Sequence, residues 1–253
     1  MQIYGHNDIN NGILKRNTKR TMNQIAFLLE MLPEHKDISI LDIGCGDGVH
    51  IAGLSEHGYQ NLTGLDYDIQ QIQKAKNRLA TANFIQKDFI THSGTYQFVF
   101  SFFGGFGYGW NRDVLQDARH IYNMLADDGI VVLDLINRDF FLYTSPLLRW
   151  HFDGEEICTE HAEFFEDRSL LHTRRQYISS KVYPASQQNM QQNQKTFDWI
   201  QRCFSPTEIE ILLQALGFGI LHIYANEQKE TPSKSHQRIL VVAQKKSSQA
   251  ISV

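Results

Sequence analysis

Short apolar runs and helical patterns alternate along this chain. The apolar runs predict strands at about 38–43, 62–65, 83–89, 96–102 and 130–136. The stretches between them place apolar residues three and four positions apart, as an amphipathic helix does. This alternation predicts an α/β fold with a doubly wound sheet, whose ligand binds at the carboxyl ends of the strands.

Capping residues mark where several helices are expected to begin. Thr21 and Gln24 have the spacing of a capping box before an apolar helical face. Asp68 stands in the same position before a helix that is expected to bury Ile69. The segment 205–208, Ser-Pro-Thr-Glu, combines a cap, a proline in the first turn and a glutamate at the third position. It predicts the last helix of the chain.

The alternation breaks between 138 and 203. The segments 155–165 and 170–180 predict the two strands of a hairpin, and 196–202 predicts a third strand. The glutamine-rich stretch 186–192 is expected to be a loop between them. An insertion after the fifth strand would lie over the carboxyl end of the sheet. It is therefore expected to act as a substrate platform and lid, or alternatively as a dimerisation surface.

One domain accounts for the whole chain. After the last helix, apolar runs at 218–225 and 237–244 predict two strands that pair antiparallel. A chain of 253 residues is commonly one unit in α/β proteins. The expected parts of a single domain over 1–253 are an N-terminal helical cap (1–35), a cofactor-binding core (36–137), the β insertion (138–203) and a C-terminal helix with two strands (204–253).

The end of the first predicted strand carries the most informative residues. Asp42 is followed by Gly44, Gly46 and Gly48, and Asp66 ends the next strand. Glycines at this spacing allow a tight turn and a close approach of a ligand to the backbone, while the following helix offers unpaired N–H groups. An acid at the end of the second strand suits the hydroxyls of a ribose. The chain is therefore predicted to bind a nucleoside-containing cofactor.

The glycine spacing separates two kinds of cofactor. The dinucleotide fingerprint G-x-G-x-x-G requires a third glycine where this chain has Val49. The carboxylate of Asp42 would repel a pyrophosphate, but it can face an ammonium group. S-adenosylmethionine carries an ammonium and a sulfonium and no phosphate. The pattern favours S-adenosylmethionine, with a NAD-type site and an ordinary glycine-rich turn as alternatives.

Other segments complete a family pattern. They are 83–89, which ends in Asp-Phe; 96–108, a strand with an aromatic, glycine-rich F-G-Y end; 46–50, which ends in a histidine; Asn137-Arg138; and 18–21. With the glycine loop, these segments resemble class I S-adenosylmethionine-dependent methyltransferases, in particular a bacterial small-molecule-type branch with an aromatic fourth motif and a β insertion after strand five. Gln97 stands where that branch usually has an acid, and Val49 where it has an arginine.

The resemblance runs from about residue 18 to 243 and implies a fold and a set of site residues. The fold is a seven-stranded Rossmann-like sheet with an antiparallel final strand and a β-rich lid. The cofactor is S-adenosylmethionine, with S-adenosylhomocysteine as product, and Asp88 would contact the adenine amino group. No catalytic residue follows from the motifs, and Tyr108 is the weak candidate. The residues expected to contact the cofactor are Arg20, Asp42, Gly44, Cys45, Gly46, Gly48, His50, Asp66, Tyr67, Asp88, Phe89, Phe102 and Phe103.

Composition narrows the partners. Apolar residues make up 42% of the chain and its net charge is −4, so a packed core is expected and a nucleic-acid partner is not. Three isolated cysteines indicate reduced thiols, and the eleven histidines show no metal-binding spacing. No apolar run approaches the roughly 20 residues of a membrane span. We expect a cytoplasmic protein, monomeric or homodimeric, with no metal.

The predicted function is transfer of a methyl group to an oxygen or nitrogen of a small or medium-sized acceptor. The alternatives are a methyltransferase acting on protein or RNA, and a non-catalytic cofactor-binding partner subunit. Many aromatic residues lie between 139 and 201, and part of this set is expected to line the acceptor pocket. The set comprises Phe140, Phe141, Tyr143, Trp150, Phe152, Phe164, Phe165, Tyr177, Tyr183, Phe197 and Trp199.

Overall fold

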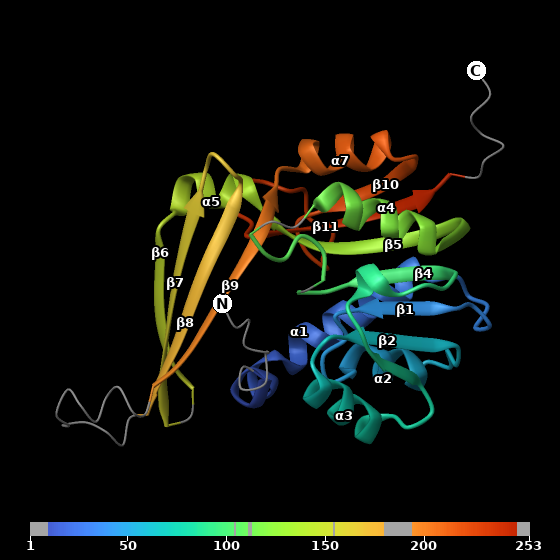
Figure 1. The fold of residues 1–253 in the computed structure, drawn as a ribbon, viewed down its shortest axis with the longest axis horizontal. Helices are drawn as coiled ribbons and strands as arrows, with labels where there is room; N and C mark the ends of the chain where they lie inside the picture. Colours follow the sequence, from blue (N-terminus) through green and yellow to red (C-terminus); the bar gives the residue numbers. More distant parts are fainter. Residues whose placement is uncertain (1–9, 104, 111–112, 154, 180–193, 247–253) are drawn as a thin grey trace.

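Seven of the 11 strands that the structure describes form the core of the molecule (Figure 1). The computed structural model describes residues 10–103, 105–110, 113–153, 155–179 and 194–246. From one edge to the other, the strands are β3 (Asn83–Gln86), β2 (Leu62–Asp66), β1 (Ile40–Ile43), β4 (Tyr96–Ser101), β5 (Leu125–Asn137), β11 (Arg238–Lys245) and β10 (Phe218–Tyr224). β1 to β5 run parallel, and β11 is antiparallel to both β5 and β10. The predicted sheet and its antiparallel final strand are confirmed.

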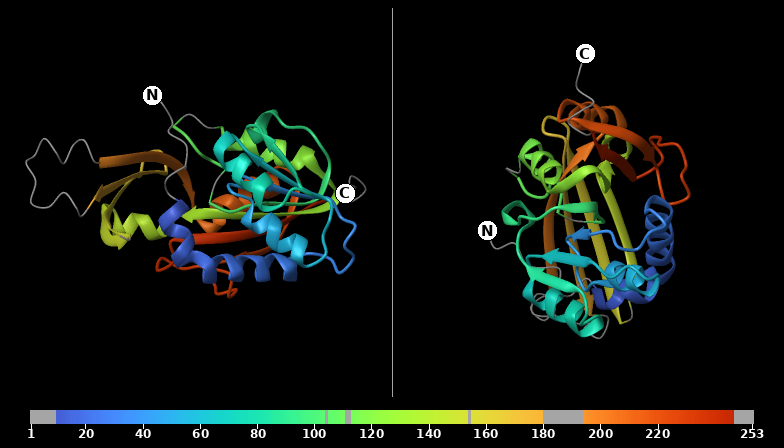
Figure 2. Two further views of the ribbon diagram at one scale, coloured as in Figure 1. Left: turned by 90° about the horizontal axis from the view of Figure 1, so that it is seen from below. Right: turned by 90° about the vertical axis from the view of Figure 1, so that its right-hand side faces the viewer.

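Helices cover both faces of this sheet (Figure 2). One buried cluster joins Phe27 of α1 (Asn10–Met31) to Ile40, together with α2 (Val49–Glu56) and α3 (Ile69–Arg78). The other joins Leu41 to Ile121 of α4 (Val114–Met124) and Ile209 of α7 (Pro206–Ala215). Successive strand residues point to opposite faces, so Ile40 and Leu41 enter different clusters. The doubly wound prediction is therefore confirmed.

The structure tests the three helix starts that were predicted from capping residues. Ser205 and Glu208 form the predicted capping box of α7, with hydrogen bonds in both directions. The start predicted at Thr21 is wrong, because α1 already begins at Asn10 and the Thr-x-x-Gln pattern lies within it. Asp68 caps α3 through the N–H of Gln70. The predicted burial of Ile69 is also wrong: the side chain is 45% exposed, because it lies on the outward side of the first turn.

The insertion folds into a second, antiparallel sheet. It begins with α5 (Arg138–Thr144), and its strands are β6 (Leu147–Asp153), β7 (Glu156–Phe165), β8 (Leu170–Ser179) and β9 (Gln194–Phe204). The predicted hairpin and third strand correspond to β7, β8 and β9. Neither α5 nor β6 was predicted. The glutamine-rich stretch 186–192 and Tyr183 lie outside the described residues.

The second sheet is attached at the carboxyl end of the core. Cys203 and Phe204 of β9 pair in parallel with Ile136 and Asn137 of β5. The parallel core strands point their carboxyl ends toward this second sheet (Figure 1). The fold therefore places the glycine loop after β1 and the acid at the end of β2 on the side of the core that faces the insertion.

Candidate cofactor-binding site

The loop after β1 depends on glycine for its backbone conformation. Gly44, Gly46 and Gly48 all have positive φ, at 75°, 53° and 74°. Side chains rarely adopt this region, so each position favours glycine. A Cβ on Gly48 would lie 2.8 Å from the ring of Phe84, whereas a Cβ on Gly46 would meet no atom within 4 Å. Gly48 is thus required by packing, and Gly46 borders open space.

Asp66 links the end of β2 to this loop. Its Oδ2 accepts a hydrogen bond of 2.9 Å from the N–H of Gly46, and its Oδ1 accepts one of 2.9 Å from the N–H of Asp68. Burial raises the pKa of Asp66, although hydrogen bonds from Asp68 and Gly46 act in the opposite direction. The prediction that the second-strand acid and the glycine loop share one edge of the sheet is confirmed.

Asp42 provides a buried acceptor beside the same loop. Its carboxyl group is buried, and Oδ2 has no hydrogen-bond partner among the described residues. Burial, followed by the nearby charge of Asp66, raises the pKa of Asp42 well above its ordinary value. An unpartnered buried carboxyl oxygen is costly. A cationic donor placed here would supply its missing hydrogen bond and favour its ionised form.

His50 and Phe102 support the loop from within the protein. The ring of His50 stacks on Phe102 at 5.1 Å, and its Nε2 donates to Oε1 of Gln24 on α1 at 3.0 Å. Burial lowers the pKa of His50 to about 4, so the ring is neutral at physiological pH. Arg78 of α3 donates to the carbonyl of Asp47 and forms an ion pair with its side chain. The loop is thereby fixed between α1 and α3.

Of the other residues that were predicted to contact the cofactor, some are exposed and some are buried in the core. Tyr67 and Asp88 are exposed, and Asp88 caps the short helix η1 (Phe89–Thr91) by accepting from the N–H of Ile90. Phe89 is buried in the cluster that contains α4, and Cys45 is also buried. The structure therefore brings Asp42, the three glycines and Asp66 into direct proximity, and Tyr67, Asp88 and Phe103 are exposed at the neighbouring strand ends.

Two arginines flank Phe103 at the end of β4. The guanidinium carbon of Arg20 lies 3.9 Å from the ring centroid, and that of Arg238 lies 4.8 Å from it. Arg238 also forms an ion pair with Asp134 of β5, whose Oδ2 has no partner among the described residues. Arg238 and Asp134 are site residues that the motifs did not indicate. Burial lowers the pKa of Arg20, while the nearby charge of Asp134 raises it, and no ion pair joins Arg20 to another of the described residues.

Tyr108 connects the loop after β4 to the second sheet. Its hydroxyl donates to the carbonyl of Phe103 at 2.7 Å, and its backbone bridges to Gln201 of β9. Burial raises the pKa of Tyr108, while the charges of Arg238 and Arg175 lower it. A phenol that stays protonated can hold the loop and donate a hydrogen bond, but it is a poor proton acceptor. This geometry favours positioning as its role.

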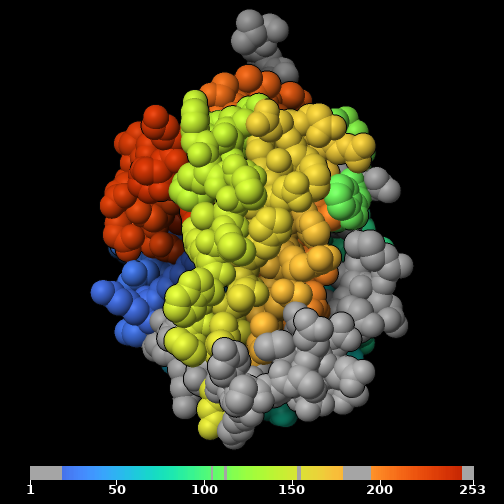
Figure 3. Space-filling model, turned by 90° about the vertical axis from the view of Figure 1, so that its left-hand side faces the viewer, coloured from blue at the N-terminus to red at the C-terminus, as the bar shows by residue number. Residues whose placement is uncertain are grey.

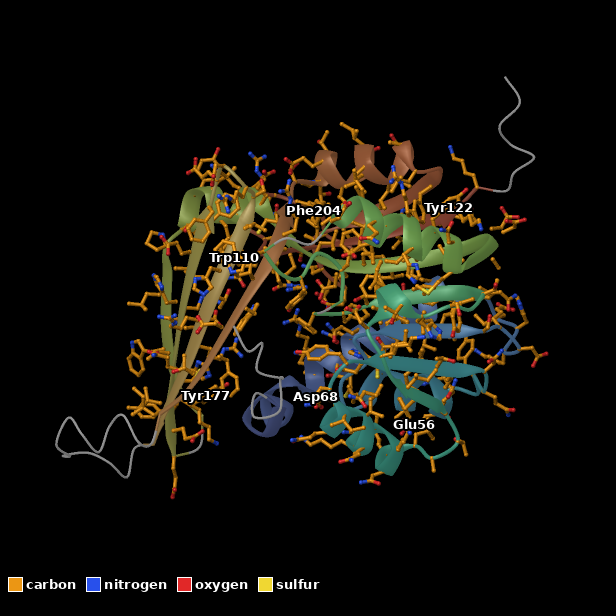
Figure 4. The ribbon with its side chains drawn as sticks, in the orientation of Figure 1. Glu56, Asp68, Trp110, Tyr122, Tyr177 and Phe204 are labelled. Carbon is orange, nitrogen blue, oxygen red and sulfur yellow. The ribbon has the colours of Figure 1, made fainter. Side chains whose placement is uncertain are left out.

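Figure 4 shows Asp68 at the strand ends of the core and Tyr177 on the second sheet opposite them.

Within the described ranges, no three His, Cys, Asp or Glu side chains gather closely enough to hold a metal ion. Cys45, Cys158 and Cys203 are buried, and no disulfide joins them. Of the helices that are described, none is long and apolar enough to cross a membrane.

A Rossmann-like sheet with an acidic glycine loop and an acid after β2 defines a nucleoside-cofactor domain. Residues 14–177 match a protein family that is described as methyltransferase domain. The match covers more than half of the chain, which therefore belongs to this family of class I S-adenosylmethionine-dependent methyltransferases.

Curated relatives include EEF1A lysine methyltransferase 2 of Homo sapiens. It is 35% identical over 159 residues, which cover 55% of this chain and 60% of the human protein. The protein of the same name from Mus musculus is 36% identical over 74 residues, covering 26% of this chain and 30% of the mouse protein. The matches thus span less than two thirds of the length of these relatives.

Solved structures resemble the whole chain. The CcbJ methyltransferase from Streptomyces caelestis has a TM-score of 0.75 at 14% identity, covering 90% of both chains. The sugar N-methyltransferase KedS8 from Streptoalloteichus sp. has a TM-score of 0.66 at 16% identity, covering 98% of this chain and 97% of that one. At these identities the likeness is one of fold, and it includes the second sheet.

The residues present fit S-adenosylmethionine. The Oδ2 of Asp42, which has no hydrogen-bond partner among the described residues, complements an ammonium group, and the guanidinium of Arg20 beside Phe103 complements a carboxylate. The carboxylate of Asp66 has acceptor capacity beyond its two backbone bonds, as ribose hydroxyls require. The open space at Gly46 lets a ligand approach the backbone.

Proposed function

We propose that this protein transfers the methyl group of S-adenosylmethionine to a nitrogen or oxygen of a small or medium-sized acceptor. The observation that carries this proposal is the attachment of the second sheet to the carboxyl end of β5 and to Tyr108. The second sheet, fixed at that position, forms a wall opposite the core. The acceptor would enter between this wall and the core. It supports a compact acceptor of the kind that the bacterial small-molecule branch uses.

The cofactor side of the reaction is assigned to the core. Asp42, Gly46, Asp66 and Arg20 would hold S-adenosylmethionine, and Asp88 and Tyr67 would contact its nucleoside end. When bound, the cofactor supplies a methyl group on a sulfonium centre. The task of the protein is to align a lone pair of the acceptor with the methyl–sulfur bond and to exclude water. Phe103, held by Arg20, Arg238 and Tyr108, is placed to shield this position.

The acceptor side is assigned to one face of the second sheet. Glu160 and Arg175 stand opposite each other on β7 and β8 and form an ion pair, and the guanidinium of Arg175 lies 5.2 Å from the ring centroid of Trp199. Cys158 and Ala162 of the same face are buried, and the charge of Arg175 acts on the hydroxyl of Tyr108. Both side chains of this ion pair are partly buried, and burial of an ion pair is weak evidence for stability. We assign this pair to recognition of the acceptor.

A protein acceptor is the second candidate. The relatives at 35% and 36% identity are named for methylation of a lysine in EEF1A. A lysine side chain is itself a small amine, so the same site geometry would serve if the peptide reached it. The two candidates differ in whether a free small molecule is sufficient for turnover.

The acceptor face is tested by changing Arg175 to lysine. Lysine keeps the charge but loses the planar, two-pronged contact with Glu160 and the stacking on Trp199. We expect kcat/KM to fall by about tenfold or more, while the affinity for S-adenosylhomocysteine stays within about twofold. Release of S-adenosylhomocysteine is measured with a panel of small amines and alcohols, and separately with purified elongation factor 1A.

Arg174→Lys is the matched control. This neighbour on β8 points to the opposite face, where it pairs with Asp198, and its replacement should leave turnover unchanged. Equal losses in both variants would contradict the assignment of the acceptor face. Turnover with the elongation factor alone would replace the small-molecule proposal by the protein one.

A further inference from the structure

The side chain of Gln24 on α1 is buried next to the first turn of α2, and only one end of its amide has a partner. The residue is 1% exposed. Its Oε1 accepts a hydrogen bond of 3.0 Å from Nε2 of His50, which follows the glycine loop at the start of α2. Its Nε2 has no hydrogen-bond partner among the described residues. An unpaired buried amide donor is costly, so it calls for an acceptor that the chain itself does not provide.

His50 determines which end of the Gln24 amide is unpaired. Burial lowers the pKa of His50 to about 4, so the ring is neutral. A neutral imidazole has one N–H donor, and the contact with Oε1 of Gln24 places that donor on Nε2. The ring is held in turn by its stacking on Phe102. The amide is therefore oriented with its oxygen toward His50 and its nitrogen away from it.

Strand alternation places two buried carboxyl groups on the sheet face that α1 covers. Ile40 of β1 and Val132 of β5 pack in the same cluster as Phe27 of α1. Asp42 and Asp134 follow them by two positions and therefore point to that same face. Each has a buried Oδ2 with no hydrogen-bond partner in the described part of the chain. With the amide on α1, this face holds one unpaired donor group and two unpaired acceptors.

Arg20 provides a second donor near Gln24. The two residues are one turn apart on α1, so their side chains lie on the same side of the helix. The guanidinium carbon of Arg20 lies 3.9 Å from the ring centroid of Phe103, at the end of β4. The charge of Arg20 also acts on the ring of His50. An anionic group bound here would therefore meet both a guanidinium and an amide N–H.

An α-amino acid group complements this arrangement. Its carboxylate accepts hydrogen bonds, which Gln24 and Arg20 can donate, and its ammonium group donates to carboxyl oxygens such as those of Asp42 and Asp134. S-adenosylmethionine and S-adenosylhomocysteine both carry such a group. The second sheet covers the strand ends of the core from the side seen in Figure 3, where β6, β7 and β8 form the visible surface. A hydrogen bond to a charged group is stronger in such a screened position than in open water.

We propose that Gln24 is a cofactor-binding residue, whose amide N–H donates to the carboxylate of the methionine part of S-adenosylmethionine beside Arg20. For this contact His50 is a positioning residue, because it orients the amide. Together they make the site selective for the zwitterionic end of the cofactor. This role of Gln24 rests on the assignment of S-adenosylmethionine as cofactor and is independent of which acceptor is methylated.

Isothermal titration with two ligands tests this role. S-adenosylhomocysteine has the carboxylate, whereas its decarboxylated analogue keeps the adenosine and the ammonium group but lacks the carboxylate. Gln24→Met keeps the length of the side chain and removes both N–H groups. We expect the affinity for S-adenosylhomocysteine to fall by about tenfold or more, as for a lost hydrogen bond to a charged group, while the affinity for the analogue stays within about twofold.

Gln71→Met is the matched control, because Gln71 of α3 is also a glutamine that is 1% exposed. Its replacement should change the affinities for the two ligands by the same factor. The double variant Gln24→Met/His50→Phe removes both polar partners at once and keeps a ring against Phe102, so it should fold even if the single variant does not. It should show the same selective loss. Circular dichroism and thermal unfolding establish that each variant is folded.

Equal changes for the two ligands in the folded Gln24 variants would overturn the proposal, and so would an unchanged affinity for S-adenosylhomocysteine. A wild type that binds the decarboxylated analogue as tightly as S-adenosylhomocysteine would also overturn it, while the assignment of the cofactor would stand. A wild type that binds neither ligand would contradict that assignment and, with it, the role of Gln24.

Discussion

Replacing Gly46 by valine should abolish binding of S-adenosylhomocysteine while the protein remains folded. A Cβ at this position meets no protein atom within 4 Å, so the branched side chain would occupy the space that borders the loop backbone. The positive φ of Gly46, 53°, adds strain of roughly 1–2 kcal/mol for a residue with a side chain. Isothermal titration and thermal unfolding should therefore show lost binding with a modest fall in melting temperature.

Gly48→Val provides the contrast. Its Cβ would lie 2.8 Å from Phe84 of β3 and 3.0 Å from the Cβ of Ala75 of α3, both of which are buried in the same core cluster. We expect this variant to lose folding stability, because neither neighbour is the flexible end of a side chain. Normal binding by Gly46→Val would show that the loop is only a turn and that the cofactor lies elsewhere.

Removing the carboxylate of Asp66 should have the second largest effect. Asp66→Ala loses the acceptor for ribose hydroxyls, and a hydrogen bond to a charged group contributes roughly 1.5–3 kcal/mol. The affinity for S-adenosylhomocysteine should fall by at least about tenfold, since about 1.4 kcal/mol corresponds to one decade. The melting temperature should also fall, because the N–H groups of Gly46 and Asp68 lose their acceptors.

Asp113→Ala separates the two effects of the Asp66 variant. Asp113 also accepts hydrogen bonds from two backbone N–H groups, those of Leu115 and Gln116 at the start of α4. Its loss should lower stability by about 1 kcal/mol without changing cofactor affinity. If both variants bind S-adenosylhomocysteine as the wild type does, Asp66 has only a structural role.

Local signals predicted the parts of the fold that depend on neighbouring residues. The glycine loop and the capping box at Ser205 are set by backbone conformation and by side chains three positions apart, so they are visible in the sequence. β6 was missed although Leu148, Trp150 and Phe152 alternate with Arg149 and His151. The alternation was the available signal, and the position of the segment directly after α5 obscured it.

The contacts among the site residues depend more strongly on tertiary structure than the glycine loop and the helix caps do. Asp134 and Arg238 are 104 positions apart, and only the pairing of β5 with β11 brings them to Phe103. No spacing in the sequence indicates that contact. The resemblance also named His50 and Phe102 as cofactor contacts; both rings are buried and stack on each other, and their contact with the cofactor stays a prediction. A motif identifies a position in the chain but not the depth of its side chain.

The central claim is that the acidic glycine loop binds S-adenosylmethionine and not a dinucleotide. Isothermal titration of the wild-type protein with S-adenosylhomocysteine, NAD and NADP tests it most directly. The buried Oδ2 of Asp42, which has no partner in the described part of the chain, complements an ammonium group, and the ionised form that such a group favours would repel a pyrophosphate. We expect saturable binding of S-adenosylhomocysteine and no measurable heat from either nucleotide. Tight binding of NAD or NADP with no response to S-adenosylhomocysteine would contradict the account.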